Sequence, residues 1–183
     1  MSLHEIVLPE TEPPTEWVRG RALQKIPGDA ACAAVQGQLA IALIGWAARG
    51  LHGRVAIGWR FRVAPPDKIV RPLVPEIAYL SYAALGPAAA DEDVAAPLGS
   101  PTVAVVIVTP HDLRADIDDR VATYLEAESA AVLVVDPHGE TIAVHDDDGV
   151  RVLLDGDVLV HGALPGFTLD VKAFFARAKR GRQ

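Results

Sequence analysis

The most constraining feature of the sequence is the uninterrupted apolar run from Val103 to Val108, which contains only Val, Ala and Ile. Such a run has no polar face to offer water, so it predicts a central strand that is covered on both sides. Leu113, Ile117 and Val121 then recur at helical spacing, and a second apolar run follows over residues 131–135. Strand, helix and strand in this order predict a right-handed parallel crossover at the centre of the domain.

The ends of this unit are marked by residues with clear local preferences. Thr109-Pro110 predicts the start of the helix, because threonine is a favoured N-cap and proline is tolerated in the first turn. Asp136-Pro137 ends the second strand. The whole unit is therefore expected to occupy Pro101 to Pro137.

Arg120 breaks the apolar pattern of the predicted helix. At about 100° per residue, it falls within roughly 20° of Leu113 and roughly 40° of Tyr124, toward the buried stripe and away from the acidic face that begins at Asp116. One interpretation is an arginine that snorkels at the edge of the stripe or pairs with Asp116. The other is a cation that faces the sheet for a functional reason, and the helical spacing alone leaves both open.

The composition fits one folded domain. The 183 residues are 50% hydrophobic, which is enough for a sizeable core. We predict an extended lead-in over residues 1–15, a domain over 16–177 and a basic tail over 178–183. The N-terminus is acidic and rich in proline, and no apolar run reaches about 18 residues, so we expect no membrane segment and a cytoplasmic location. Cys32 is the only cysteine, which excludes an internal disulfide and a cysteine zinc cluster.

The charge balance argues against a protein that holds nucleic acid by its overall field. The formal net charge is −7 and the isoelectric point is about 5.3. A local basic patch stays possible, and the C-terminal end equally suits a helix-dipole complement. The candidate cations are Arg49, Arg54, Arg60, Arg62, Lys179, Arg180 and Arg182.

The remaining elements are indicated by apolar spacing and by turn residues. Asp29 predicts the cap of a long helix that ends at Gly50, with an apolar stripe of Val35, Leu39, Leu43 and Trp46. The other predicted elements are a short strand or hairpin over 16–26, an alternating strand over 54–63, a strand within 69–82, a hairpin over 141–154 with an Asp-Gly turn, and a C-terminal helix with Val171, Phe174 and Phe175.

Two features that resemble metal ligands have simpler interpretations. The run Asp146-Asp147-Asp148 lacks the alternating spacing and closing glutamate of a calcium loop, so it predicts a solvated turn. His138, His145 and His161 lie on or beside the same hairpin without a ligand-like helical pair, and we expect them at the surface.

Several segments taken together resemble a known family. They read E-W-V-R-G-R-A-L-Q-K, W-R-F-R-V, V-R-P-L-V-P-E-I-A-Y, V-A-V-V-I-V-T-P, R-V-A-T-Y-L, V-V-D-P and L-P-G-F-T-L. In this order and spacing they resemble the Uma-two type of restriction endonuclease, within the PD-(D/E)xK nuclease superfamily. The resemblance covers residues 16–175 and implies an α/β (α+β) domain with a restriction-endonuclease-like fold, in which a mixed central sheet is flanked by helices and carries additional β-hairpins. By analogy it implies divalent-metal-dependent cleavage of DNA.

The resemblance also implies where the active site lies, and the residues depart from the family's pattern there. The family's proline-aspartate matches Pro75-Glu76, which keeps a carboxylate, whereas its second acid matches Val106. Its helix lysine matches Arg120, which accounts for a cation on the apolar stripe. A frequent histidine of the family matches Cys32 or a neighbour, and an acid before its Trp-Arg-Phe-Arg segment matches Gly58.

These departures affect the chemistry directly. Mg²⁺ is held by one or two carboxylates near the scissile phosphate, while a lysine can orient or deprotonate the attacking water. Val106 has no oxygen, and the guanidinium of Arg120 stays protonated, although it could bind a phosphate. Glu76 alone would make a poor metal site.

Three functions are consistent with these residues. The first is a catalytically degenerate member of this DNA endonuclease family. The second is an active Mg²⁺- or Mn²⁺-dependent endonuclease that uses Glu76 with a substitute acid such as Glu16, and the third is a non-enzymatic assembly or interaction protein. The resemblance also favours a homodimer, and DNA is the possible ligand.

Overall fold

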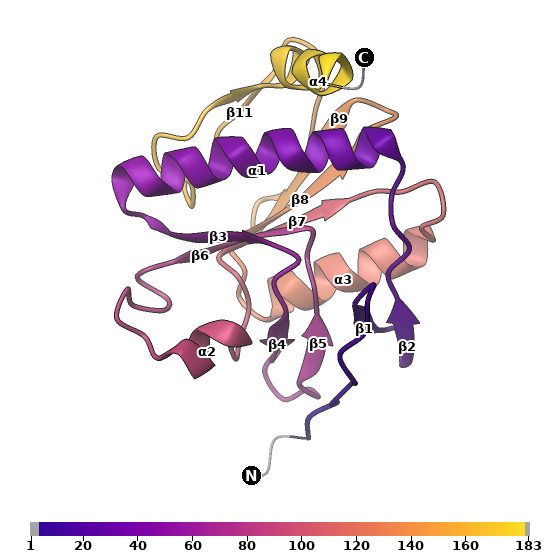
Figure 1. Ribbon diagram of the computed structural model, residues 1–183, viewed down its shortest axis with the longest axis vertical. Coiled ribbons are helices and arrows are strands. Elements are labelled where there is room, and N and C mark those ends of the chain that lie inside the picture. The colour runs from indigo at the N-terminus through magenta and orange to yellow at the C-terminus, as the bar shows by residue number, and fades with distance from the viewer. Residues whose placement is uncertain (1–3, 182–183) are drawn as a thin grey trace.

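The computed structural model describes residues 4–181, and a six-stranded mixed sheet forms its centre (Figure 1). The strand order is β10-β9-β8-β7-β6-β3. The strands are β3 (Gly53–Ile57), β6 (Ile77–Ser81), β7 (Val103–Ile107), β8 (Ala131–Asp136), β9 (Thr141–Asp146) and β10 (Gly149–Leu153). β7 and β8 are parallel, whereas the other neighbouring strands of this sheet are antiparallel. The predicted mixed sheet is thus confirmed.

Helices cover both faces of this sheet (Figure 1). The helix α1 (Ala30–Gly50) packs with α4 (Val171–Arg180) on one face, and α3 (Arg114–Glu126) packs on the other. A short helix, α2 (Asp91–Ala95), lies in the loop between β6 and β7. The three small two-stranded sheets are β1 (Thr15–Val18) with β2 (Arg21–Gln24), β4 (Phe61–Val63) with β5 (Arg71–Leu73), and β11 (Val158–Leu159) with β12 (Leu169–Asp170).

The strand β7 separates two hydrophobic cores, as the continuous apolar run predicts. Val103, Val105 and Ile107 join the core beneath α1 and α4, whereas Ala104 and Val106 join the core beneath α3. All five residues of β7 are buried. A strand with apolar side chains on both faces therefore fits this central position.

The helix α1 confirms the prediction made from its cap and stripe. The Asp29 carboxylate accepts hydrogen bonds from the backbone N–H groups of Ala31 and Cys32, and Leu51 ends the helix in the left-handed region with φ of 48°. By length and composition alone this helix could span a membrane. Its predicted stripe is instead buried against the sheet and α4, as expected for a core helix.

The start of α3 differs from the prediction. The helix begins at Arg114, and Leu113 is its N-cap residue without a side-chain hydrogen bond. Thr109 and Asp112 first form a turn, in which the Thr109 N–H donates to the Asp112 carboxylate at 2.8 Å and the Asp112 N–H donates to the Thr109 carbonyl. The prediction that Thr109-Pro110 starts the helix was therefore wrong, because this turn uses the same residues.

Two predicted single strands are each divided into two. The alternating segment 54–63 breaks at Gly58, whose φ of +60° turns the chain so that β3 stays in the main sheet and β4 pairs with β5. The segment 69–82 divides likewise into β5 and β6. Large apolar residues continue to alternate with other residues on both sides of Gly58, so the sequence pattern gave no sign that the strand breaks there.

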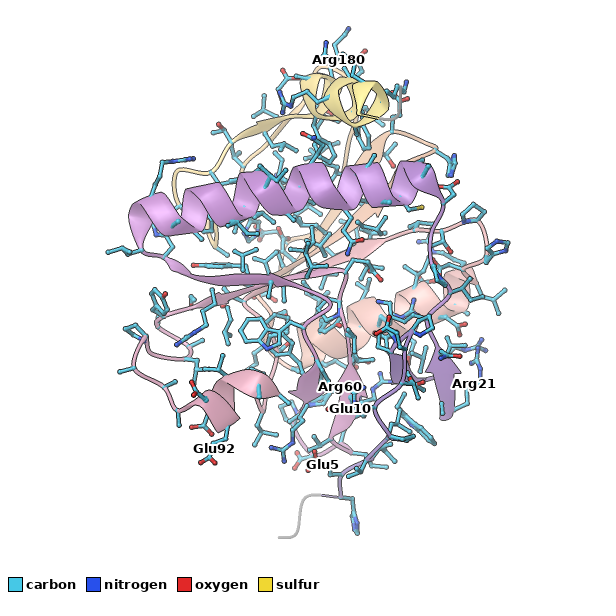
Figure 2. All side chains as sticks on the ribbon, viewed as in Figure 1. Glu5, Glu10, Arg21, Arg60, Glu92 and Arg180 are labelled. Carbon is cyan, nitrogen blue, oxygen red and sulfur yellow. The ribbon has the colours of Figure 1, made fainter. Side chains whose placement is uncertain are left out.

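Outside the interior, charged side chains such as Glu92 and Arg180 lie at the periphery of the domain (Figure 2). The lead-in runs beside the small sheet of β4 and β5. There Glu5 forms a β-bridge with Val70 and an ion pair with Arg62. Parts of the predicted lead-in (1–3) and tail (182–183), including Arg182, lie outside the described residues.

The position of β7 predicts a large effect of truncating its side chains. Val105→Ala should lower the free energy of unfolding by about 1–4 kcal/mol, because it leaves a cavity in a closed core. Val152→Ala is the matched control, since Val152 is 55% exposed on the edge strand β10 and should change stability by less than about 0.5 kcal/mol. Urea denaturation of both variants measures the difference. Equal stability of the two variants would contradict the central placement of β7.

Candidate active site

The hairpin of β1 and β2 places a fully buried carboxylate beside α3. Glu16 is 0% exposed, and its side chain points inward from β1. Its Oε1 accepts a hydrogen bond from the Val74 N–H at 2.7 Å, and its Oε2 accepts one from Arg120 Nε at 2.8 Å. A buried carboxylate requires such partners, because an unpaired buried charge is costly. Glu16 is thus held by one backbone group and one cation.

Glu76 lies just before β6, at the edge of the same interior region. Its Oε2 accepts a hydrogen bond from the Ile107 N–H at 3.0 Å, and its own N–H donates to the Val105 carbonyl. Because β6 and β7 pair Ile77 with Val105, the antiparallel register brings Glu76 opposite Val106. The two positions that the family resemblance assigns to acids are therefore neighbours, and only one of them carries an oxygen.

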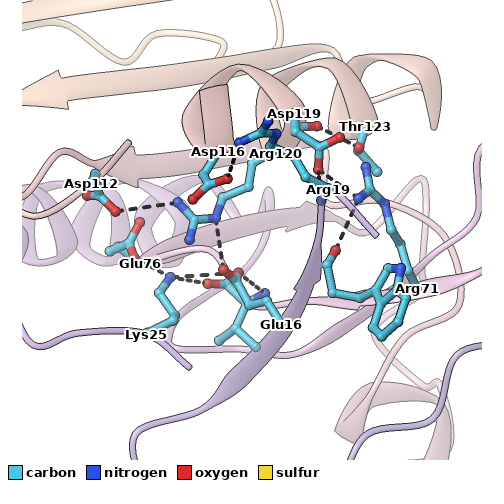
Figure 3. A network of polar contacts seen from close by, with 12 residues as sticks. Glu16, Arg19, Lys25, Arg71, Glu76, Asp112, Asp116, Asp119, Arg120 and Thr123 are labelled. Atoms are coloured by element: carbon cyan, nitrogen blue, oxygen red, sulfur yellow. Dashed lines mark hydrogen bonds and ion pairs between the residues drawn. The ribbon is translucent and has the colours of Figure 1, made fainter. Parts of the chain in front are cut away.

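Lys25 supplies a cation between the two carboxylates (Figure 3). Its Nζ contacts Glu76 Oε1 and lies 3.8 Å from Glu16 Oε1, and it also donates to the Val74 carbonyl. Burial alone would lower the pKa of Lys25, but the negative charges of Glu16 and Glu76 raise it above its ordinary value. The side chain is therefore an ammonium at neutral pH.

Arg120 faces the sheet and completes this arrangement. In addition to the Glu16 contact, its Nη1 lies 3.7 Å from Asp112 Oδ1. Burial opposes its charge, but the charges of Glu16, Glu76 and Asp112 raise its pKa overall. We call Glu16, Lys25, Glu76, Asp112 and Arg120 the central charged cluster.

The interpretation that Arg120 snorkels or pairs with Asp116 was wrong. Asp116 is itself buried, and it binds Arg21 at 2.8 Å and Arg19 at 3.4 Å. Burial would raise the pKa of Asp116, but the hydrogen bonds and charges of Arg21 and Arg19 hold it below its ordinary value. The acidic face of α3 begins in the interior at Asp116 because the β1–β2 hairpin packs over it.

Asp119 of α3 binds both the β1–β2 hairpin and Arg71 of β5. Asp119 Oδ2 accepts hydrogen bonds from Arg71 Nη1 at 2.7 Å and from the Arg19 N–H at 3.1 Å. Arg71 also donates to the Trp17 carbonyl. The position of Glu16 is therefore set by several contacts outside the central charged cluster.

Sequence reasoning missed Lys25. It lies one residue beyond β2, where its N–H donates to the Pro14 carbonyl. A lone lysine after a short strand resembles any solvated residue, and only the tertiary packing of the hairpin brings it to Glu76. Gln36, which lies outside the predicted apolar stripe of α1, donates its side-chain N–H to the Glu76 carbonyl at 3.0 Å.

Tyr124 is the one described residue with a fully buried side-chain oxygen or nitrogen that lacks a hydrogen-bond partner. Its ring fills the core beneath α3. Burial raises the pKa of its phenol well above the ordinary value, and the charges of Glu16 and Glu76 add to this effect. The phenol is therefore neutral and cannot act as a base at physiological pH.

Two cavities reach the central charged cluster from different sides. One of about 160 Å³ is lined by residues that include Arg21, Lys25, Glu76 and Arg120. The other, of about 400 Å³, includes Lys25, Glu76, Cys32 and Gly58. The positions that the resemblance assigned to the family's histidine and further acid thus line the same cavity as Glu76, with side chains of different chemistry.

The residues present do not fit a magnesium site. Mg²⁺ requires oxygen ligands at about 2.0–2.1 Å in octahedral geometry. Val106 offers no oxygen, and Glu16 and Glu76 each contact a cationic side chain. A divalent ion would have to displace Lys25 before it could reach both carboxylates.

The burial of the Glu16–Arg120 pair predicts a large cost for removing one partner. Arg120→Met should lower the free energy of unfolding by about 3–5 kcal/mol, because Glu16 would be left as a buried unpaired charge. Adding Glu16→Gln to this variant should recover part of the loss. Urea denaturation measures both effects.

The matched control is Arg114→Met, which removes an exposed pair with Asp118 on the same helix. Pairs of this kind contribute about 0.3–0.5 kcal/mol. If Arg120→Met costs no more than Arg114→Met, then the buried pair does not hold the hairpin.

Comparisons with known proteins identify the family and the fold of the chain. A family model described as "Uma2: Putative restriction endonuclease" matches residues 3–172. The chain is also similar to the crystal structure of a "putative nuclease belonging to DUF820" from Anabaena variabilis, with a TM-score of 0.80 and 19% sequence identity over 93% of this chain and 94% of that one. At this identity the likeness establishes the fold alone. A search of the curated proteins found no match.

Proposed function

Because the chain belongs to the Uma2 family of restriction endonucleases, we propose that it is a catalytically degenerate member, which keeps the nuclease fold but does not cleave DNA. The observation that carries this proposal is the contact of the Lys25 ammonium with Glu76, close to Glu16. A tethered cation thereby supplies the positive charge that a metal ion would bring to these carboxylates. A fixed ammonium, however, can neither coordinate a phosphate oxygen and a water together nor lower the pKa of that water as a metal ion does.

The other two positions support the same conclusion. Val106 is buried in the core beneath α3, so the position opposite Glu76 offers no oxygen to a metal ion. Arg120 is almost always protonated and already donates to Glu16, so it has no capacity to accept a proton. Its Nε–H is committed to Glu16, and its Nη1 lies 3.7 Å from Asp112. Every carboxylate and every cation of the central charged cluster already has an oppositely charged partner within 4.0 Å.

The alternative is an active enzyme in which Glu16 substitutes for the missing acid. The observation in its favour is that Glu16 and Glu76 both lie near Lys25, so that one small ion could reach both. This alternative requires Mg²⁺ or Mn²⁺ to displace the Lys25 ammonium from the two carboxylates. The two functions therefore differ in whether the wild-type protein binds these ions.

Metal binding and cleavage of plasmid DNA test the proposal. Wild-type protein should show no heat of Mg²⁺ or Mn²⁺ binding beyond that of the Glu76→Ala variant, and both should leave supercoiled plasmid intact. Metal-dependent nicking by purified wild-type protein that Glu76→Ala abolishes would overturn the proposal and establish the alternative.

A stepwise repair provides a positive test. Val106→Glu adds a carboxylate opposite Glu76, and Lys25→Met removes the competing cation while keeping a long apolar stem. The double variant should bind Mn²⁺ at least about 10-fold more tightly than wild type, since it exchanges a cation for an anion in the site. Turnover should require Arg120→Lys as well, because an amine can lose its proton whereas a guanidinium cannot. Unchanged Mn²⁺ affinity in a folded double variant would contradict the role given to Lys25.

DNA is the ligand that the family suggests for this fold. The net charge of −7 predicts weak, salt-sensitive contact at most. In the C-terminal helix, Lys179 already pairs with Glu140, which reduces the basic charge that this end offers. Homodimerisation and a cytoplasmic location stay predictions.

A further inference from the structure

A second group of side chains with metal-ligand chemistry lies at the N-terminal end of α1. Asp29 precedes the helix, Cys32 lies in its first turn, and His138 lies in the turn between β8 and β9. One ligand atom from each of the three lies within 4.8 Å of the others. The Asp29 Oδ2 and the His138 Nε2 are hydrogen-bonded at 2.9 Å. We propose that Asp29, Cys32 and His138 form a binding site for Zn²⁺ or a similar borderline divalent ion, with water as the fourth ligand.

The donor set selects the class of ion. A thiolate and an imidazole favour Zn²⁺ over Mg²⁺ or Ca²⁺, which prefer oxygen ligands alone. Three protein ligands with one open position are typical of zinc sites that hold a water molecule. The central charged cluster contains neither sulfur nor imidazole, so it lacks the donors that favour zinc.

The distances suit insertion of an ion without rearrangement of the backbone. Zinc bonds of about 2.0–2.3 Å place the corners of a tetrahedron roughly 3.3–3.8 Å apart. The Asp29 Oδ2 and His138 Nε2 atoms, which are 2.9 Å apart, must therefore separate by less than about 1 Å. Ligand atoms that are up to 4.8 Å apart must approach each other by a similar amount. Rotation of side chains supplies movements of this size.

Two of the three ligands are also held by their own local structure. Asp29 is fixed by its capping bonds, which leave Oδ2 facing His138. The turn that carries His138 is fixed by Asp136, whose Oδ1 accepts the N–H groups of His138 and Gly139 at 2.9 Å. Hydrogen bonds of this kind orient the side chains that bind the ion in metal sites.

The thiol is reachable from the larger cavity. Cys32 lines the cavity of about 400 Å³ together with Gly28 and Thr109. A side chain at position 28 would meet Cys32 Cβ at 2.4 Å and Sγ at 3.0 Å, so glycine keeps this approach to the thiol open. A metal-bound water would face the cavity that Glu76 also lines. The prediction that His138 lies at the surface is confirmed, and the fold brings this exposed imidazole to Asp29 and Cys32.

Titration of the full-length protein with zinc chloride in a calorimeter tests this proposal. We expect one ion per chain with micromolar or tighter affinity. Cys32→Ser, His138→Gln and Asp29→Asn should each weaken binding by at least about 10-fold, and asparagine keeps the N-cap at position 29. The matched control is His161→Gln, because His161 pairs with Asp146 at 3.2 Å in a site that lacks a thiol. It should leave the affinity unchanged.

A second measurement does not depend on the stability of any variant. Co²⁺ bound to wild-type protein should give the near-ultraviolet charge-transfer band of a cobalt–thiolate bond, and excess Zn²⁺ should remove it. Absence of both the band and zinc binding would overturn the proposal, as would unchanged zinc affinity in folded Cys32→Ser and His138→Gln. Glu76→Ala should retain zinc binding, so this result is independent of the proposed loss of nuclease activity.

Discussion

The buried ion pair between Glu16 and Arg120 is the interaction on which the candidate site depends. Glu16 is completely enclosed, and its carboxylate can remain charged only because Arg120 and the Val74 N–H bind its two oxygens. The pair joins the N-terminal hairpin to α3 across the edge of the sheet. Lys25 enters the interior with this hairpin and reaches Glu76. The Lys25 ammonium thus balances the negative charge of Glu16 and Glu76 and also fills the space between the two carboxylates.

This balance explains how the interior is stable with Val106 opposite Glu76. With a glutamate in place of Val106, a third carboxylate would face Glu76 and would need a cation of higher charge. With valine there, the position joins the apolar core beneath α3, and two singly charged side chains suffice for Glu16 and Glu76. The site is accordingly consistent with stability in the absence of metal, whereas a cluster of unpaired acids would depend on a bound ion.

The sequence predicted the parts of the fold that depend on local pattern. The apolar run at Val103, the crossover that follows it and the stripe of α1 each have a spacing that admits few alternatives, and the structure confirms them. The angle of Arg120 on the helix showed that it lies near the buried stripe, but it left open whether the side chain faces the sheet or pairs with Asp116. Lys25 and the burial of Asp116 were not predictable in this way, because both depend on how a hairpin from the N-terminus packs against a helix about a hundred residues later.

The order of the chain also determines when the central charged cluster can form. The sequence from β7 to β10 is continuous and folds on itself through neighbouring strands and one crossover helix. Glu16 and Arg120, in contrast, are separated by 104 positions, and the loop that joins them carries a large closure entropy. Contacts with such a separation form after local ones have reduced the freedom of the chain. We therefore expect the pairing of these charges to follow the local contacts of β7 to β10, so that the region around Glu76 would stay open to water and ions until the N-terminal hairpin packs against α3.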